Sequence, residues 1–76
     1  MNKTYPAYKV MNAIYSTFLN VGNKEYAKNK TNNFLNRCGA DINKPKEQPL
    51  STEHIREIVH AMLDENTEKI FWRNLY

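Results

Sequence analysis

Apolar residues recur at helical spacing between positions 7 and 21, and this pattern constrains the fold more than any other feature of the chain. A helix places residues three and four positions apart on one face, and Pro6 suits a first helical turn because it lacks a backbone N–H. Neighbouring Tyr8, Tyr15 and Leu19 widen that face. The sequence therefore predicts an amphipathic helix over about residues 6–20, centred on the apolar side chains Ala7, Met11, Ile14, Phe18 and Val21.

A second helix is expected directly after a tight turn at residues 21–23. Gly22 can adopt the left-handed conformation that ends a helix, and Asn23 can cap the helix that follows. That helix should run over about residues 24–38 and depend on packing, because its many asparagines compete with the helical backbone for hydrogen bonds. Gly39 is a natural end for it. So short a link predicts that the two helices form an antiparallel hairpin.

Residues 39–50 form the one long connection in the chain. Pro45 and Pro49 restrict the residues before them to extended conformations, which favours a surface loop. We expect the Ile42 side chain to pack from this loop against the helices.

The third helix, expected over about residues 51–64, has the clearest start signal in the chain. Ser51 is a good N-cap, and Leu50 and Ile55 occupy the two positions of a hydrophobic staple. An apolar arc of isoleucine, valine, methionine and leucine follows at helical spacing, which predicts that one face of this helix is buried.

The polar run after Leu63 leaves two alternatives open. It is either a solvent-exposed segment of one longer helix, or a break after which Asn66 or Thr67 caps a short fourth helix. In both cases the predicted fold class is all-α: a single domain over residues 1–76, folded as a small bundle of three to four helices that begins with the helical hairpin. The predicted elements are helices at about residues 6–20, 24–38, 51–64 and 67–75, with a loop at 39–50.

Size and composition limit how such a bundle is stabilised and where it works. A chain of 76 residues buries a modest core, and Cys38, its only cysteine, cannot form a disulfide within the chain. An unpaired, reduced cysteine suits the cytoplasm. The chain has no apolar run of the roughly 18–20 residues that cross a bilayer, and it begins with none of the features of a signal peptide. We therefore expect a cytoplasmic protein without a membrane partner.

Charge is distributed unevenly along the chain. Residues 1–48 carry eight basic and three acidic side chains, a net charge of +5, whereas residues 49–76 carry a net charge of −2. Lysine and arginine neutralise phosphates, and asparagine can read an adenine edge, so the second helix is a candidate recognition helix of a helix-turn-helix. The candidate nucleic-acid contacts in segment 24–37 are Lys24, Lys28, Asn29, Lys30, Asn32, Asn33, Asn36 and Arg37.

Aromatic residues are numerous for so thin a bundle, nine in all, and several lie near the chain ends where burial is hardest. Exposed aromatic rings beside arginine are common in the energetic centres of protein interfaces. The alternative is that the terminal rings fold back and close the core of the monomer. The candidate protein-interface residues are Tyr5, Phe71, Trp72, Arg73 and Tyr76.

Two weak patterns concern catalysis and metal binding. Glu57 and His60 have the Glu-x-x-His spacing of bundle metal sites, and Cys38 could in principle pair with His54 or His60 as a nucleophile. Metal sites of that kind need a second such pair facing inward, and a buried Cys38 at a helix end is the simpler explanation. We therefore expect no catalytic residue, no metal and no cofactor, and we interpret one acidic strip as a solvated helix face: Glu53, Glu57, His60 and Asp64.

These patterns favour a non-enzymatic regulator, inhibitor or adaptor that binds stoichiometrically to a protein, either a different one or a second copy of itself as a homodimer. A small DNA- or RNA-binding regulator that uses segment 24–37 is the alternative. Compact chains of this composition suit accessory proteins of phages or mobile elements, an association that no motif in the chain carries.

Overall fold

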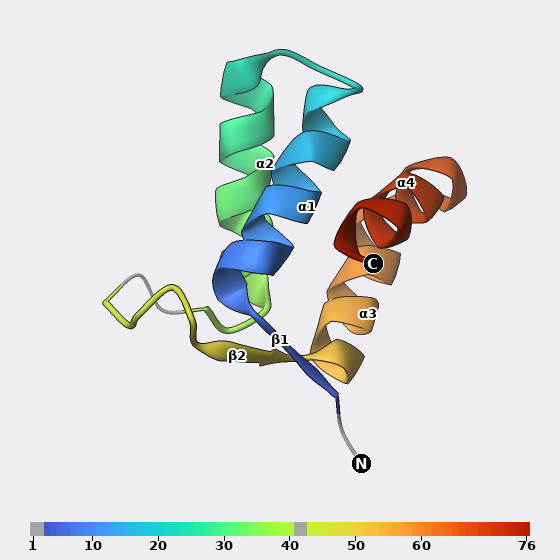
Figure 1. The fold of residues 1–76 in the computed structure, drawn as a ribbon. Helices are drawn as coiled ribbons and strands as arrows, with labels where there is room; N and C mark the ends of the chain where they lie inside the picture. Colours follow the sequence, from blue (N-terminus) through green and yellow to red (C-terminus); the bar gives the residue numbers. More distant parts are fainter. Residues whose placement is uncertain (1–2, 41–42) are drawn as a thin grey trace.

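Four helices and a two-stranded sheet make up the part of the chain that the computed structural model describes, residues 3–40 and 43–76 (Figure 1). The helices α1 and α2 lie side by side as an antiparallel hairpin, α3 and α4 lie to one side of them, and the strands meet at the base. In chain order the elements are β1 (Thr4–Pro6), α1 (Ala7–Leu19), α2 (Lys24–Arg37), β2 (Pro49–Ser51), α3 (Thr52–Met62) and α4 (Glu65–Leu75).

The small sheet corrects the all-α prediction and shortens the predicted loop 39–50. Strand β1 pairs antiparallel with β2, and Tyr5 lies opposite Leu50 in the register. Prolines at both strands favour extended backbone, and both central side chains are buried, so pairing is stabilised by the core that it closes. The Thr52 hydroxyl donates a hydrogen bond to the Lys3 carbonyl at 2.6 Å, which stabilises the end of the two-stranded sheet. Ile42 lies outside the described residues.

The predicted first helix is confirmed, but its buried face is rotated from the predicted one. Val21 is 54% exposed and Met11 is only half-buried. The rotation arises because α4 packs against α1 on the other flank, where the Asn74 amide donates to the Thr17 hydroxyl at 3.2 Å. The buried residues of α1 are Ala7, Val10, Ala13, Ile14, Thr17 and Phe18.

The second helix begins as predicted, with the Asn23 side chain accepting a hydrogen bond from the Tyr26 N–H at 2.8 Å. Gly22 is not left-handed, however, because α1 ends through a right-handed residue, Asn20. A side chain at Gly22 would instead collide with the Tyr26 ring. Gly39, at a φ of +83°, is the one described residue in the left-handed region, and it ends α2 as predicted.

The third and fourth helices are separate, which settles the alternative that the sequence left open. Leu63 is extended, and Asp64, rather than Asn66 or Thr67, caps α4 by accepting a hydrogen bond from the Thr67 N–H at 2.8 Å. The hydrogen bond with the Thr67 side chain contributes most to lowering the pKa of Asp64. Helix α4 therefore begins two residues earlier than predicted.

Two buried threonines differ in how their hydroxyls are satisfied. The Thr17 hydroxyl donates to the Ala13 carbonyl at 2.7 Å and also accepts from Asn74. The Thr31 hydroxyl is buried in α2 and has no hydrogen-bond partner. A buried polar group without a partner costs free energy, whereas a paired one contributes to stability.

Valine replaces threonine at nearly the same volume, so two single substitutions test this difference. Thr17→Val should lower the free energy of unfolding by about 1–2 kcal/mol, because Asn74 loses its partner. Thr31→Val should raise it by about 1 kcal/mol. Urea unfolding followed by circular dichroism measures both, and an equal loss of stability in the two variants would contradict this assignment.

Candidate binding groove between α1 and α2

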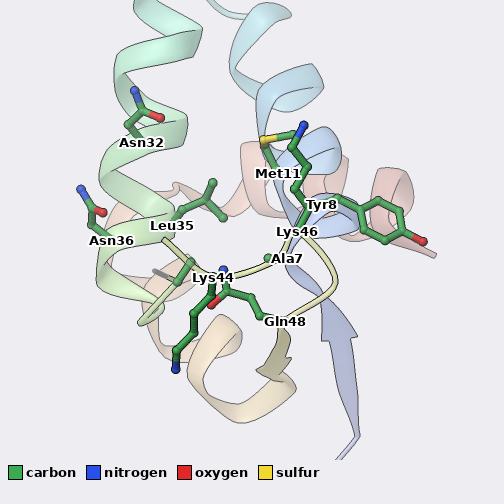
Figure 2. Close-up of a pocket in the computed structure, with 10 residues that line it drawn as sticks. Ala7, Tyr8, Met11, Asn32, Leu35, Asn36, Lys44, Lys46 and Gln48 are labelled. Atoms are coloured by element: carbon green, nitrogen blue, oxygen red, sulfur yellow. The ribbon is translucent and has the colours of Figure 1, made fainter. Parts of the chain in front are cut away.

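A hollow of roughly 500 Å³ lies between α1, α2 and the loop at residues 43–48 (Figure 2). Figure 2 shows Leu35 pointing from α2 toward the loop and α1, whereas Asn32 and Asn36 lie on the outer side of α2. Lys46 extends from the loop toward Met11, and the Tyr8 ring forms the outer rim, directed away from α2. The lining residues are Ala7, Tyr8, Met11, Asn32, Leu35, Asn36, Ala40, Lys44, Lys46 and Gln48.

A second hollow of roughly 340 Å³ continues the first along the same pair of helices. Met11 and Asn32 line both hollows, so the two are contiguous. We refer to them together as the α1–α2 groove. The second hollow is lined by Met11, Asn12, Tyr15, Lys28, Thr31 and Asn32.

The groove exists because the apolar arc of α1 is wider than the core can cover. Tyr8, Met11, Tyr15 and Leu19 recur at helical spacing on the flank of α1 away from its buried face, and Tyr8 and Leu19 remain 43% and 39% exposed. Helix α4 packs on the opposite flank. This apolar strip is therefore only partly covered by α2: Met11 and Tyr15 are half-buried, and Tyr8 and Leu19 stay exposed.

The loop that borders the groove, residues 43–48, is hydrogen-bonded to the first turn of α1. The Ala7 N–H donates to the Gln48 carbonyl at 2.8 Å, and the Tyr8 N–H donates to the Lys46 carbonyl at 2.9 Å. These bonds use two of the backbone donors that the first turn of a helix leaves free. They hold the backbone of Lys46 beside the groove.

The charged side chains that line the groove are all positive among the described residues. Lys28, Lys44 and Lys46 line it, and none of its described lining residues is acidic. Like charges gathered around an apolar floor favour a ligand of opposite charge, because each lysine gains an attraction that it lacks in the free protein.

The predicted aromatic interface is largely used inside the fold. Tyr5 and Phe71 are 7% and 0% exposed, so neither is available to a partner. The half-buried Trp72 donates from Nε1 to the Glu68 carboxylate at 3.2 Å and stacks on Tyr76. Only Tyr76, which is 72% exposed, and Arg73 remain open. The terminal rings fold back because closing the core removes more apolar surface from water than leaving them outside.

The predicted nucleic-acid residues stay mostly at the surface of α2. Seven are exposed, and Lys30 is half-buried with its amine 5.8 Å from the centre of the Tyr26 ring. Helices α1 and α2 lie side by side and antiparallel, whereas the two helices of a helix-turn-helix cross at roughly 90–120°, so this pair does not have that arrangement. The exposed residues are Lys24, Lys28, Asn29, Asn32, Asn33, Asn36 and Arg37.

The acidic strip of α3 is exposed, as the interpretation of a solvated face requires. Nδ1 of His60 lies 3.6 Å from a carboxylate oxygen of Glu68, which joins α3 to α4. Within residues 3–40 and 43–76, no three histidine, cysteine or acidic side chains gather in a way that could hold a metal ion. The exposed residues of the strip are Glu53, Glu57, His60 and Asp64.

Cys38 lies at the end of α2 and is 5% exposed. Burial disfavours the charged thiolate and raises the pKa of Cys38 to about 12. Because the thiolate is the reactive form, this thiol is a poor nucleophile in the folded protein. The prediction that Cys38 is a buried core side chain is confirmed.

Comparisons of the chain with protein-family models, curated proteins and solved structures found no match. The described residues contain no helix with both the length and the apolar character that a membrane crossing requires.

Burial of Cys38 predicts slow thiol modification. At about pH 8 the folded protein should react with a maleimide or disulfide reagent far more slowly than the urea-unfolded chain, whose thiol pKa returns to about 8.5. A Cys38→Ser, Ser16→Cys double variant supplies the matched control, because Ser16 is exposed on α1. Equal rates for the folded protein and this control would contradict the assignment.

Proposed function

We propose that this protein is a small non-enzymatic regulator, inhibitor or adaptor that binds a partner protein stoichiometrically through the α1–α2 groove. The observation that carries the proposal is the apolar strip of α1, partly exposed over a contiguous hollow. Monomeric proteins rarely leave a contiguous apolar surface open unless it serves an interaction.

The composition of the groove supports binding rather than catalysis. Its floor and rim combine tyrosine, methionine and leucine with amides and lysines. Tyrosine and methionine are enriched at protein interfaces, and amides at a rim supply hydrogen bonds. The described lining residues include no histidine, cysteine or carboxylate to transfer a proton or attack a substrate.

Substitutions in the groove test this function. Met11→Gln places a polar group of similar size on the floor, and Tyr8→Ala removes the rim ring. Each should weaken a stoichiometric partner by roughly tenfold or more if it removes an interface anchor. The measurement is affinity capture from a lysate of the source cells, followed by titration of the purified partner.

Tyr26→Ala is the matched control, because Tyr26 is 41% exposed, close to the 43% of Tyr8, and lies outside the groove. It should leave the partner bound. Circular dichroism confirms that all three variants are folded. A partner retained equally by Met11→Gln and Tyr26→Ala would rule out the groove as its binding surface.

Nucleic-acid binding is the second candidate, and the exposure of the asparagines on α2 favours it. Under this function the protein should retard a duplex DNA or single-stranded RNA probe at about 50 mM salt and release it as salt rises. Asn29→Ala with Asn33→Ala should weaken that complex, while Tyr8→Ala should not, because Tyr8 lies on α1, outside segment 24–37. The absence of any retarded band would exclude this candidate.

A further inference from the structure

We infer that the occupant of the α1–α2 groove is an acidic amphipathic helix from a different protein. This inference rests on the proposed function and names the partner's chemistry. Three observations carry it. They are the spacing of the partly exposed strip on α1, the lack of side-chain hydrogen-bonding groups on the floor of the groove (Met11, Leu35 and Ala40), and the positive charge around the groove.

The partly exposed apolar strip on α1 has the residue spacing at which two helices pack together. Tyr8, Met11, Tyr15 and Leu19 follow intervals of three and four residues along α1. Such a row forms a ridge that fits the groove of a neighbouring helix. The part of this row that lines the groove, from Tyr8 to Tyr15, runs about 10 Å along the helix axis, which matches about two turns of a partner helix, and Leu19 continues the row beyond the groove.

The floor also favours a helix over an extended strand. Met11, Leu35 and Ala40 supply apolar contacts but no side-chain hydrogen bonds to a backbone. A helix satisfies most of its backbone groups internally, whereas a strand laid on this floor would leave buried N–H and C=O groups unpaired. The amides of Asn32 and Asn36 lie at the outer edge, where a helix presents polar side chains.

The positive charge around the groove favours acidic residues on the two polar flanks of a partner helix. Lys28 borders one end of the groove, Lys44 and Lys46 border the other, and the described lining residues offer no carboxylate in return. An acidic residue on each flank of a partner helix would meet a lysine, whereas a basic helix would meet like charge.

A second copy of this chain fits the groove poorly. Two α1–α2 grooves packed face to face would bring their lysines together, and like charges in contact oppose association. The chain's own acidic strip lies on α3, so docking it into the groove would join two different surfaces. Such head-to-tail contacts extend into chains of molecules unless the geometry closes them into a ring.

A display library tests the inference without knowledge of the natural partner. The probes are helical peptides of about four turns, with apolar residues at i, i+4 and i+7 and random residues elsewhere. They are selected against the intact protein, with Met11→Gln as the counter-selection target. Selected peptides should be enriched in aspartate and glutamate over the starting library, and they should lose affinity as salt rises.

Charge-reversed variants then locate the contact. Lys28→Glu with Lys46→Glu should weaken a selected peptide by roughly tenfold or more. Arg56→Glu with Lys69→Glu changes the net charge equally on exposed residues outside the groove, and it should alter the affinity by less than about threefold. Amide chemical shifts should move along α1 and α2 and stay unchanged on the acidic face of α3.

Each other outcome overturns the inference. Neutral or basic selected peptides, no enrichment at all, or equal effects of the two charge-reversed variants would exclude an acidic helix. A dimer in sedimentation experiments that Met11→Gln dissociates would identify a second copy as the occupant. If the captured partner is lost in Met11→Gln while selected peptides are not acidic, the proposed function stands and only this inference fails.

Discussion

The packing of α1 against two other helices is the constraint on which the rest of the structure depends. Val10 and Ile14 are fully buried, and α2 and α4 both pack on this helix. The Phe34 and Phe71 rings, 5.6 Å apart, join α2 to α4 directly and complete the arrangement. A helix of 13 residues is marginal alone in water, so α1 persists because its neighbours bury its inner face.

The two short strands close the end of this core that the helices leave open. An isolated two-stranded ribbon is marginally stable at best, so the pairing of Tyr5 with Leu50 must be supported from outside the sheet. Burial of both side chains against the helices gives that support. The sheet in turn places α3 beside the hairpin, and the hydrogen bond from Thr52 to Lys3 fixes its start.

The α1–α2 groove follows from the same arrangement. A small domain has too few elements to cover every apolar flank, and α4 covers one side of α1 while the side that bears Tyr8 stays open. The terminal aromatic rings complete the core. The surface that we propose for recognition is consequently a lysine-rimmed helical flank near the start of the chain.

The sequence by itself determined the first three helices, because apolar spacing and caps such as Asn23 act within a few residues and leave a local pattern. It also marked Gly39 as the end of α2 and Cys38 as a buried residue. The sequence held one indication of the groove that Leu35 and Lys46 line: the apolar arc on α1 is broader than a single buried face. Only the tertiary structure decided the strand pairing, the burial of Tyr5 and Phe71, and which flank of α1 stays open. These features depend on contacts between residues far apart in the chain, whose free energy no local pattern records.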